Sequence, residues 1–390
     1  MSHCHAGLDP ASMQLAPWIA GAATPDSIRG RHDNGTLAIS VSLSGCVRLR
    51  ILSAAPAYPY HSGMSFIAIL VALLLEQARP LARANPIHGL LRGWAGWTTR
   101  NFDAGRPQHG WLSWSVAVLS PALAVLVVYW LLVRFIGWPA AILWNIAVLY
   151  ITLGFRQFSH HFTELRDALD SGDEDRARQL LAQWRQVDAT GSSKSDIARQ
   201  VIEYSVIAAH RHVFGVLAWF SVLAAVGLGP AGAVLYRMSE FVPRYWVHKD
   251  SANGHPVSGA LQAVAMQAWL VVDWLPARIT AMGFAVVGSF EEAIESWRNY
   301  EHQGARDNDG VILAATAGAV NLRLGRAAFA EDATARFTSG KSTTARSHGG
   351  VPLGQEPEAA HLRIIVGLVW RTVVMWMILL ALLTLARLLG

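Results

Sequence analysis

Cysteine is almost absent from this sequence, and charged residues are scarce. The only two cysteines, Cys4 and Cys46, lie within the first 63 residues, and Asp, Glu, Lys and Arg together make up 15% of the chain. A disulfide framework or a cysteine metal site is therefore excluded for everything after residue 63. Residues 1–30 also lack an apolar core of the length that a cleavable signal peptide requires.

Apolar residues are abundant instead, and they are gathered into long runs. They make up 53% of the 390 residues, and several of the 16 tryptophans bracket the runs, as an interfacial aromatic belt does. Apolar runs of this length are typical of transmembrane helices. The sequence therefore predicts an all-α, multi-pass membrane protein whose first partner is the lipid bilayer.

The meaning of the net charge of +5 depends on where the basic residues lie. Most of them flank the apolar runs, where they set topology and contact anionic lipid. Aromatic and basic residues do not interleave in the manner of RNA-binding surfaces. We therefore expect no nucleic-acid partner.

The apolar runs divide into about four firm spans and one or two partial ones. The firm spans are 111–135, 138–154, 259–288 and 364–386. The last span is expected to carry Arg371 buried in its first half. Residues 64–75 are too few to cross about 30 Å of hydrocarbon at about 1.5 Å per residue, so we predict a partial segment there. The run 213–236 is interrupted by Gly227–Gly232 and is either one bent crossing or a re-entrant hairpin.

Domain boundaries follow from changes in composition. Residues 1–63 are rich in Gly, Ala, Ser and Pro without lasting periodicity, and we interpret them as an extension upstream of a true start at Met64. Residues 64–326 form the predicted membrane domain. Ser, Thr and Gly dominate a predicted flexible linker at 327–360, which precedes a C-terminal transmembrane helix at 361–390.

Two polar segments within the membrane domain are assigned to the cytoplasm. Residues 79–106 are basic and punctuated by Pro and Gly, and the positive-inside rule places this predicted loop in the cytoplasm. In residues 155–211, apolar side chains recur at three- and four-residue steps. We therefore predict a helical cytoplasmic insertion at 155–211, broken at Ser171-Gly172-Asp173.

A carboxylate, a proline and an arginine interrupt the run 259–288, at Asp273, Pro276 and Arg278. Ionisable groups at membrane depth are costly and usually face a protein interior or a watery cavity. Pro276 also frees a backbone carbonyl one turn earlier, which a polar site or a neighbouring helix must satisfy. The alternative is a kinked helix whose charged side chains reach the headgroups.

Three further groups of polar residues admit both a site and a plain structural interpretation. Asp307-Asn308-Asp309-Gly310 offers oxygen ligands and backbone amides, either as a Mg²⁺–phosphate cradle or as a simple helix cap. Glu203 with Arg199 is either a solvated pair or part of a site. His160, His161 and Glu164 lie within one helical turn, and we favour interfacial groups over a metal site there.

Several stretches in a fixed order carry a family resemblance. They are Pro86-Ile87-His88, Ala168-Leu169-Asp170-Ser171-Gly172-Asp173, Leu217-Ala218-Trp219-Phe220, Gly229-Pro230-Ala231-Gly232-Ala233 with Tyr236, Asp273-Trp274-Leu275-Pro276-Ala277-Arg278, Asn308-Asp309-Gly310 with Ala317-Gly318-Ala319, and Pro352-Leu353-Gly354. With them, the chain from about residue 64 to residue 385 resembles the CobD/CbiB family of cobalamin-biosynthesis membrane proteins. It also resembles the related AmpE-type signalling proteins.

The first resemblance implies an enzyme of the cell inner membrane that joins an aminopropanol unit, or its phosphate, to a corrinoid carboxyl group. This amide-forming step uses ATP and Mg²⁺, and a corrinoid intermediate is the implied partner. Such chemistry needs carboxylates for the metal and cations or donors for phosphate. The implied catalytic residues are Asp188, Glu203, Asp273 and Arg278, and the implied cofactor-binding residues are Asp307, Asn308, Asp309 and Gly310.

Departures from the synthase pattern leave a second interpretation open. Trp269-Leu270 occupies the place of a paired aspartate, and Ile207-Ala208 stands where the family usually has Glu-Asn. AmpE-type proteins share the Asp-Trp-x-Pro-x-Arg stretch and the lone C-terminal span, and they are regarded as membrane sensors. The alternative is therefore a non-catalytic inner-membrane sensor. A small-solute transporter is less favoured, because recognisable inverted halves are lacking.

Overall fold

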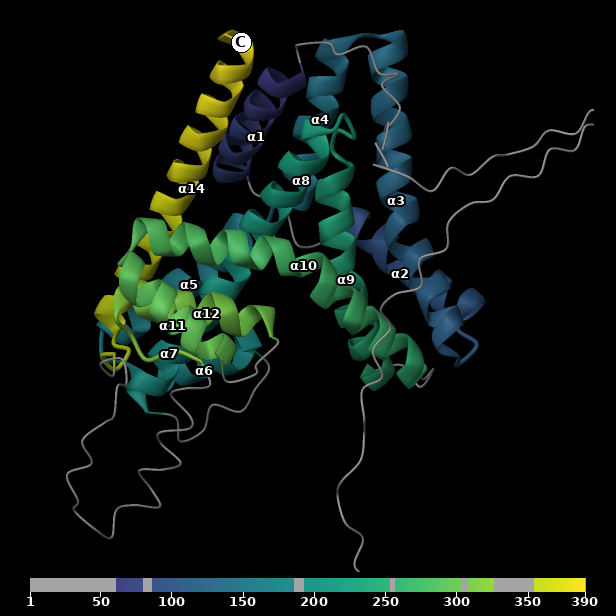
Figure 1. Ribbon diagram of the computed structural model, residues 1–390. Helices are drawn as coiled ribbons and strands as arrows, with labels where there is room; N and C mark the ends of the chain where they lie inside the picture. Colours follow the sequence, from purple (N-terminus) through teal and green to yellow (C-terminus); the bar gives the residue numbers. More distant parts are fainter. Residues whose placement is uncertain are drawn as a thin grey trace, which may run out of the picture. The chain divides into compact units, whose positions relative to one another are not determined.

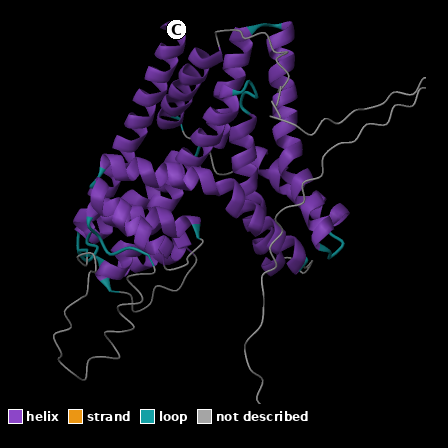
Figure 2. Cartoon of the chain, viewed as in Figure 1, coloured by secondary structure: helices purple, strands orange, loops and turns teal. Residues whose placement is uncertain are grey.

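The computed structural model describes residues 61–79, 86–185, 193–252, 257–302, 307–325 and 354–389. All of these residues belong to one compact unit that covers residues 57–390. The described residues form helices and contain no β-strand, only an isolated bridge between Leu322 and Gln355 (Figure 2). The predicted all-α architecture is confirmed.

Figure 1 shows the helices in chain order. They are α1 (His61–Ala78), α2 (Pro86–Phe102), α3 (Pro107–Phe135), α4 (Trp138–Thr152), α5 (Phe155–Asp170), α6 (Glu174–Arg185), α7 (Lys194–Ala209), η1 (His210–Phe214), α8 (Gly215–Ala225), α9 (Ala231–Ala252), α10 (Gly259–Val287), α11 (Phe290–His302), α12 (Asn308–Val320) and α14 (Ala359–Leu389). The element η1 is a single π-helical turn inside the continuous run from α7 to α8.

By length and composition, 4 helical stretches could cross a membrane. They are α3, the continuous run of α7, η1 and α8, then α10, and α14 as far as Ala386. Helices α1 and α4 are apolar but shorter. The prediction of a multi-pass membrane protein is confirmed, and three of these stretches match predicted firm spans. The predicted span at 138–154 is the shorter helix α4, and the stretch from Lys194 to Ala225 takes in the last part of the predicted cytoplasmic insertion at 155–211.

Two clusters of buried apolar side chains form the core, and α10 contributes to both. Trp269 and Phe284 of α10 belong to the cluster that includes α1, α5 to α9, α12 and α14. Leu261 and Ala265 belong to the cluster that joins α10 to α2, α3 and α9. The helix that carries Asp273 therefore links the two parts of the core.

The predicted loop at 79–106 is wrong over most of its length, because helix α2 occupies Pro86–Phe102. Its glycines Gly89 and Gly93 lie on the face that has no neighbouring atoms, and the helix continues through both. Its other face packs against α3 and α9, where the Trp94 indole donates to Ala117 O at 3.2 Å and the Trp246 indole donates to Ala95 O at 3.0 Å. Burial of this face outweighs the weak helix propensity of glycine.

Of the two alternatives for the run 213–236, the structure shows a helical hairpin. Helix α8 ends at Ala225, the chain turns, and α9 begins at Ala231. A Cβ atom on Gly232 would lie 2.0 Å from Trp219 O, so this glycine permits the close approach of α9 to α8. The predicted break at Ser171-Gly172-Asp173 also exists, between α5 and α6.

Arg371 was expected to be buried, but it is exposed on α14 beside Trp370. An exposed arginine beside a tryptophan is typical of the membrane–water boundary, where the guanidinium reaches the headgroups. Other predictions lie outside the described residues. These are the extension at 1–63 except for residues 61–63, and the linker at 327–360 as far as residue 353. The predicted domain division stays a prediction.

Candidate functional site

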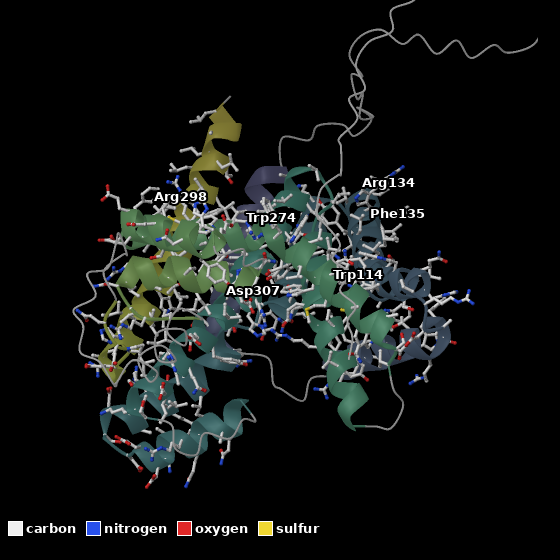
Figure 3. The ribbon with its side chains drawn as sticks, turned by 60° about the horizontal axis from the view of Figure 1, so that its bottom comes forward. Trp114, Arg134, Phe135, Trp274, Arg298 and Asp307 are labelled. Carbon is white, nitrogen blue, oxygen red and sulfur yellow. The ribbon has the colours of Figure 1, made fainter. Side chains whose placement is uncertain are left out.

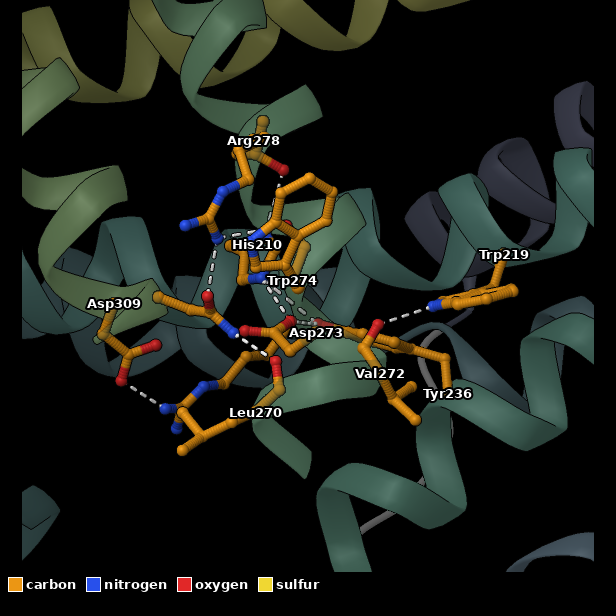
Figure 4. A network of polar contacts seen from close by, with 12 residues as sticks. His210, Trp219, Tyr236, Leu270, Val272, Asp273, Trp274, Arg278 and Asp309 are labelled. Carbon is orange, nitrogen blue, oxygen red and sulfur yellow. Dashed lines mark hydrogen bonds and ion pairs between the residues drawn. The ribbon is translucent and has the colours of Figure 1, made fainter. Parts of the chain in front are cut away.

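A polar network buried between helices surrounds Asp273 (Figure 4). His210 comes from η1, Tyr236 from α9, and Asp273 and Thr280 from α10. All of these residues have 0% of their surface exposed. A buried carboxylate is tolerated only where hydrogen bonds or opposite charge compensate for its lost hydration, and this network supplies the hydrogen bonds.

The two carboxylate oxygens of Asp273 have different surroundings. Oδ1 lies 2.9 Å from His210 Nε2 and accepts a hydrogen bond from the Tyr236 hydroxyl at 2.8 Å. The other ring nitrogen of His210, Nδ1, lies 2.9 Å from Thr280 Oγ1, which fixes the orientation of the imidazole. Oδ2 is buried and has no hydrogen-bond partner. Asp273 is thus held through one oxygen, and the other is left for a ligand or a proton.

Two local features of the chain allow Tyr236 and Asp273 to meet. Gly215 follows the π-helical turn, and a Cβ atom there would lie 2.0 Å from Tyr236 Cζ, so the tyrosine ring lies against the bare backbone. Pro276 frees the carbonyl of Val272, and the Trp219 indole donates to this oxygen at 2.9 Å. The sequence predicted that a neighbouring helix must satisfy this carbonyl, and α8 does so.

Arg278 joins α10 to α11 and α12. Its guanidinium donates to Asn308 Oδ1 at 2.7 Å and to Glu301 Oε1 at 3.4 Å, and it lies 4.6 Å from the centre of the Trp274 ring. The amide of Asn308 donates in turn to Leu270 O at 2.9 Å. Two predicted site residues, Arg278 and Asn308, are therefore in direct contact.

Arg211 and Asp309 form an ion pair next to this network. Arg211 Nε and Asp309 Oδ1 are both buried without a hydrogen-bond partner. Burial raises the pKa of Asp309; the Arg211 charge opposes this shift, and the charges of Asp307 and Asp273 add to it.

The Arg211 guanidinium lies 5.8 Å from the centre of the Trp269 ring, which in turn lies 5.4 Å from the Tyr236 ring. Arg211 therefore has an aromatic face beside it as well as the Asp309 carboxylate. A cation is attracted to that face more weakly than to a carboxylate.

The structure therefore brings Asp273, Arg278, Asn308 and Asp309 together, but it places Asp307 and Gly310 in structural roles. The Asp307 carboxylate accepts from the backbone N–H groups of Asp309 and Gly310, as the helix-cap alternative expects. A Cβ atom on Gly310 would lie 1.8 Å from the Tyr300 hydroxyl, so Gly310 permits this packing. Cofactor binding by these residues stays a prediction.

Glu203 lies on α7, and its carboxylate accepts a hydrogen bond from Gly325 N at 2.8 Å, after the end of α12. Among the described residues, no hydrogen bond or ion pair joins it to Asp273 or Arg278. Asp188 lies outside the described residues, as do the side chains of His160 and His161. Their roles stay predictions.

Sequence reasoning did not assign His210, Tyr236 or Arg211 to the site. His210 and Arg211 stand where a polar helix becomes apolar, a position typical of charges at a membrane boundary. The π-helical turn that aims His210 at Asp273 has no sequence signal of its own. Tyr236 was singled out only as a landmark of the family resemblance.

Comparison with known proteins identifies the family. A sequence model described as CobD/Cbib protein matches residues 65–348, which include every residue of the network. The chain belongs to the CobD/CbiB family. A protein of Stutzerimonas stutzeri named cobalamin biosynthesis protein CobD is 29% identical over 324 residues, covering 81% of this chain and 96% of that protein.

Proteins with the same name in two other bacteria match over shorter regions. The protein of Chromobacterium violaceum is 31% identical over 180 residues, covering 46% of this chain and 54% of that protein. The protein of Leptospira interrogans is 27% identical over 195 residues, covering 48% of this chain and 58% of that protein. No solved structure matches the chain.

Proposed function

We propose that the protein acts in cobalamin biosynthesis, in the cell inner membrane, and catalyses the amide-forming attachment of an aminopropanol unit, or its phosphate, to a corrinoid carboxyl group. Membership of the CobD/CbiB family supports the pathway, because its relatives are named for cobalamin biosynthesis. The observation that carries the catalytic proposal is the buried Asp273, which keeps one oxygen unpartnered.

Asp273 has the features of a general base for the amine. Formation of an amide requires that the attacking nitrogen lose a proton, and a positioned carboxylate can accept it. His210 and Tyr236 hold Oδ1, which fixes the carboxylate and leaves Oδ2 as the accepting atom. In this proposal Asp273 is the catalytic residue, and His210 and Tyr236 position it.

We further propose that the protein uses ATP and Mg²⁺. When bound, they would activate the corrinoid carboxyl group and neutralise phosphate charge. The described residues contain no group of three or more His, Cys, Asp or Glu side chains that could hold a metal ion. Mg²⁺ is commonly held by one or two carboxylates together with substrate phosphates. The unpartnered atoms Asp309 Oδ1 and Arg211 Nε fit this arrangement, as a ligand for the metal and a donor to phosphate.

Complementation tests the proposal. A strain that lacks the synthase is supplied with the wild-type chain, with Asp273→Asn, or with Asp175→Asn, a matched change at an exposed residue of α6. We expect growth with the wild type and Asp175→Asn, and no growth with Asp273→Asn. The non-catalytic sensor predicts no growth with any of the three chains, and that result would contradict the proposed synthase.

A further inference from the structure

Helix α10 has the length and composition of a membrane span. The contacts of its N-terminal end show on which side of the membrane that end lies. Ser258, which caps α10, donates to Asp103 through its backbone N–H at 2.9 Å and through its hydroxyl at 2.6 Å. Asp103 lies just before α3. A Cβ atom on Gly110, in the first turn of α3, would lie 3.2 Å from Val264 Cγ2. Helix α10 therefore begins beside the N-terminal end of α3.

The other end of α10 lies beside the middle of α14, at the level of the exposed Arg371, which marks the membrane–water boundary on that helix. A Cβ atom on Gly283 would lie 3.0 Å from Thr372 Cγ2, directly after Arg371. The chain after α12 and the chain before α14 are joined by backbone hydrogen bonds, Arg323 N to Gln355 O at 3.0 Å and Gln355 N to Asn321 O at 2.9 Å.

These two ends lie on the same side of the membrane. Helices α3 and α4 form a hairpin, held in part by the Trp144 indole, which donates to Val125 O at 3.1 Å (Figure 1). Helix α5 therefore starts on the side where α3 starts. Helix α5 is polar and charged and does not cross hydrocarbon, so its last residue, Asp170, lies on that side as well. Asp170 forms an ion pair with Arg363 of α14 at 2.9 Å, which places the start of α14 on that side too. A helix that begins and ends on one side does not cross.

The neighbour of the second half of α10 supports this placement. Helix α11 lies along it, through the Arg278–Glu301 ion pair and the packing of Ala285 against Ala293. The exposed charged residues of α11 are Glu291, Glu292, Glu295, Arg298 and Glu301. So many exposed charges are excluded from hydrocarbon. The part of α10 beside α11 must therefore lie at a depth where α11 reaches water.

Helix α10 nevertheless exposes large apolar side chains. They are Met266 (48% exposed), Leu270 (37%), Val271 (70%), Trp274 (55%), Met282 (41%) and Val286 (56%). Figure 3 shows Trp274 on the outside of α10, and Arg298 on α11. An apolar face with a tryptophan, flanked by charged elements, is typical of a helix that lies in the membrane interface.

We propose that α10 does not cross the membrane but lies in its plane, with these exposed side chains in the boundary between headgroups and acyl chains. Figure 1 shows α10 running across the direction of α14, as this placement requires. Asp273, which faces the opposite, buried side of the same helix, then lies at the membrane surface. The Arg211–Asp309 pair lies at the same level, on the side of α5, α11 and α12.

Labelling of single cysteines in the full chain tests the sidedness of α10. Cys4 and Cys46 are first changed to serine, and a membrane-impermeant maleimide is then applied to each side of sealed vesicles. Gly259→Cys lies in open space at the start of α10, Glu291→Cys is exposed just after its end, and Ile136→Cys lies in the turn after α3. We expect residues 259 and 291 to react from the same side and residue 136 from the other. Reaction of residues 259 and 291 from opposite sides would overturn the proposal.

Spin labels measure depth along the same helix. Labels at 266, 271 and 282 of α10 are compared with labels at 112, 123 and 131 of α3, which are exposed at similar fractions. We expect the α10 labels to lie at one shallow depth, about 5–10 Å into the membrane, and the α3 profile to be deepest at 123. A profile along α10 that is deepest in its middle contradicts the proposal. Labels on α10 that contact only water, or only a second copy of the chain, would contradict the proposal too.

Discussion

Helices α3 and α10 are both long and apolar enough to cross a membrane, although α3 is the more apolar of the two, with a mean hydropathy of 2.5 against 1.5. Each has 29 residues and an internal proline, Pro121 or Pro276. Each proline frees a carbonyl, and in each case a tryptophan of another helix donates to that oxygen, at 3.2 Å for Ala117 O and at 2.9 Å for Val272 O. In both helices, an indole N–H from another helix satisfies the carbonyl that the proline leaves without a donor.

They differ in the partners of their polar side chains. In α3, the Ser120 hydroxyl donates to the carbonyl of Val116 within its own helix. In α10, Asp273, Thr280 and Arg278 are bound by residues of other helices. Apolar composition therefore permits a helix to contact lipid, whereas partners far away in the sequence decide how it lies and what it does.

Removal of the Asp273 carboxylate is expected to have the largest effect. Asp273→Ala leaves His210 and Tyr236 buried without their shared acceptor, and we expect a loss of about 3–5 kcal/mol in the free energy of unfolding. Ser120→Ala in α3 is expected to cost less than about 1 kcal/mol, because it removes a single hydrogen bond within one helix. Unfolding in mixed micelles measures both. Equal losses of unfolding free energy for the two variants would show that the Asp273 network stabilises the fold no more than a single hydrogen bond within one helix does.

Arg278 of α10 and Arg134 of α3 are expected to differ in how much each stabilises the fold. Arg278→Gln removes charged hydrogen bonds to Asn308 and Glu301, with an expected cost of about 1.5–3 kcal/mol. Arg134 is exposed near the end of α3, and Arg134→Gln is expected to change stability by no more than about 0.5 kcal/mol. The same unfolding measurement compares the two variants. A larger effect at Arg134 would refute the assignment of Arg278 as the link from α10 to α11 and α12.

The two tryptophans test what the helices share. Trp94→Phe and Trp219→Phe each leave a proline-freed carbonyl without its donor, and each is expected to cost about 1–3 kcal/mol. Only Trp219→Phe is also expected to reduce complementation, because Val272 adjoins Asp273. Unfolding and growth are measured in parallel. Equal impairment of growth by both variants at equal stability would contradict a specific role of the Trp219–Val272 hydrogen bond in holding Asp273.

The smallest expected effect is the contribution of Asp309 to the pH dependence of the free energy of unfolding. Burial raises its pKa, so the folded protein holds this proton more tightly than the unfolded chain does. The stability of the wild type relative to Asp309→Asn is therefore greatest below about pH 4, the ordinary range of aspartate. It falls as the pH rises through the raised pKa of the folded state. Unfolding of both proteins across this range measures the difference, and a difference that grows with pH would show that the Arg211 charge outweighs burial.

Much of the fold could be predicted from the sequence, because a long apolar run indicates a membrane-type helix and a proline within it indicates a carbonyl that lacks its usual donor. The span from Trp111 to Phe135 lies within α3, and Pro276 correctly signalled a carbonyl that another helix must satisfy. Helix α2 was missed because its glycines and basic residues are typical of a loop, whereas packing against α3 and α9 stabilises it.

The site was harder to predict than the fold. Asp273, Arg278, Asn308 and Asp309 stood out as polar residues in or beside apolar runs. His210 and Tyr236 are separated from Asp273 by 63 and 37 residues, and a π-helical turn sets the direction of His210. Asp307 was grouped with the ligands because its sequence suits a cradle and a cap equally, and only the structure shows that it caps α12.

We propose that Asp273 serves the reaction and does not merely hold helices together. The most direct test of this role is the rate of amide product formation in proteoliposomes by the wild type and by Asp273→Asn, two proteins of nearly the same shape. We predict that Asp273→Asn folds with nearly the same unfolding midpoint, because Asn can still accept from His210 and Tyr236, and that its rate falls by about 10²-fold or more. An unchanged rate in the folded variant would contradict this account.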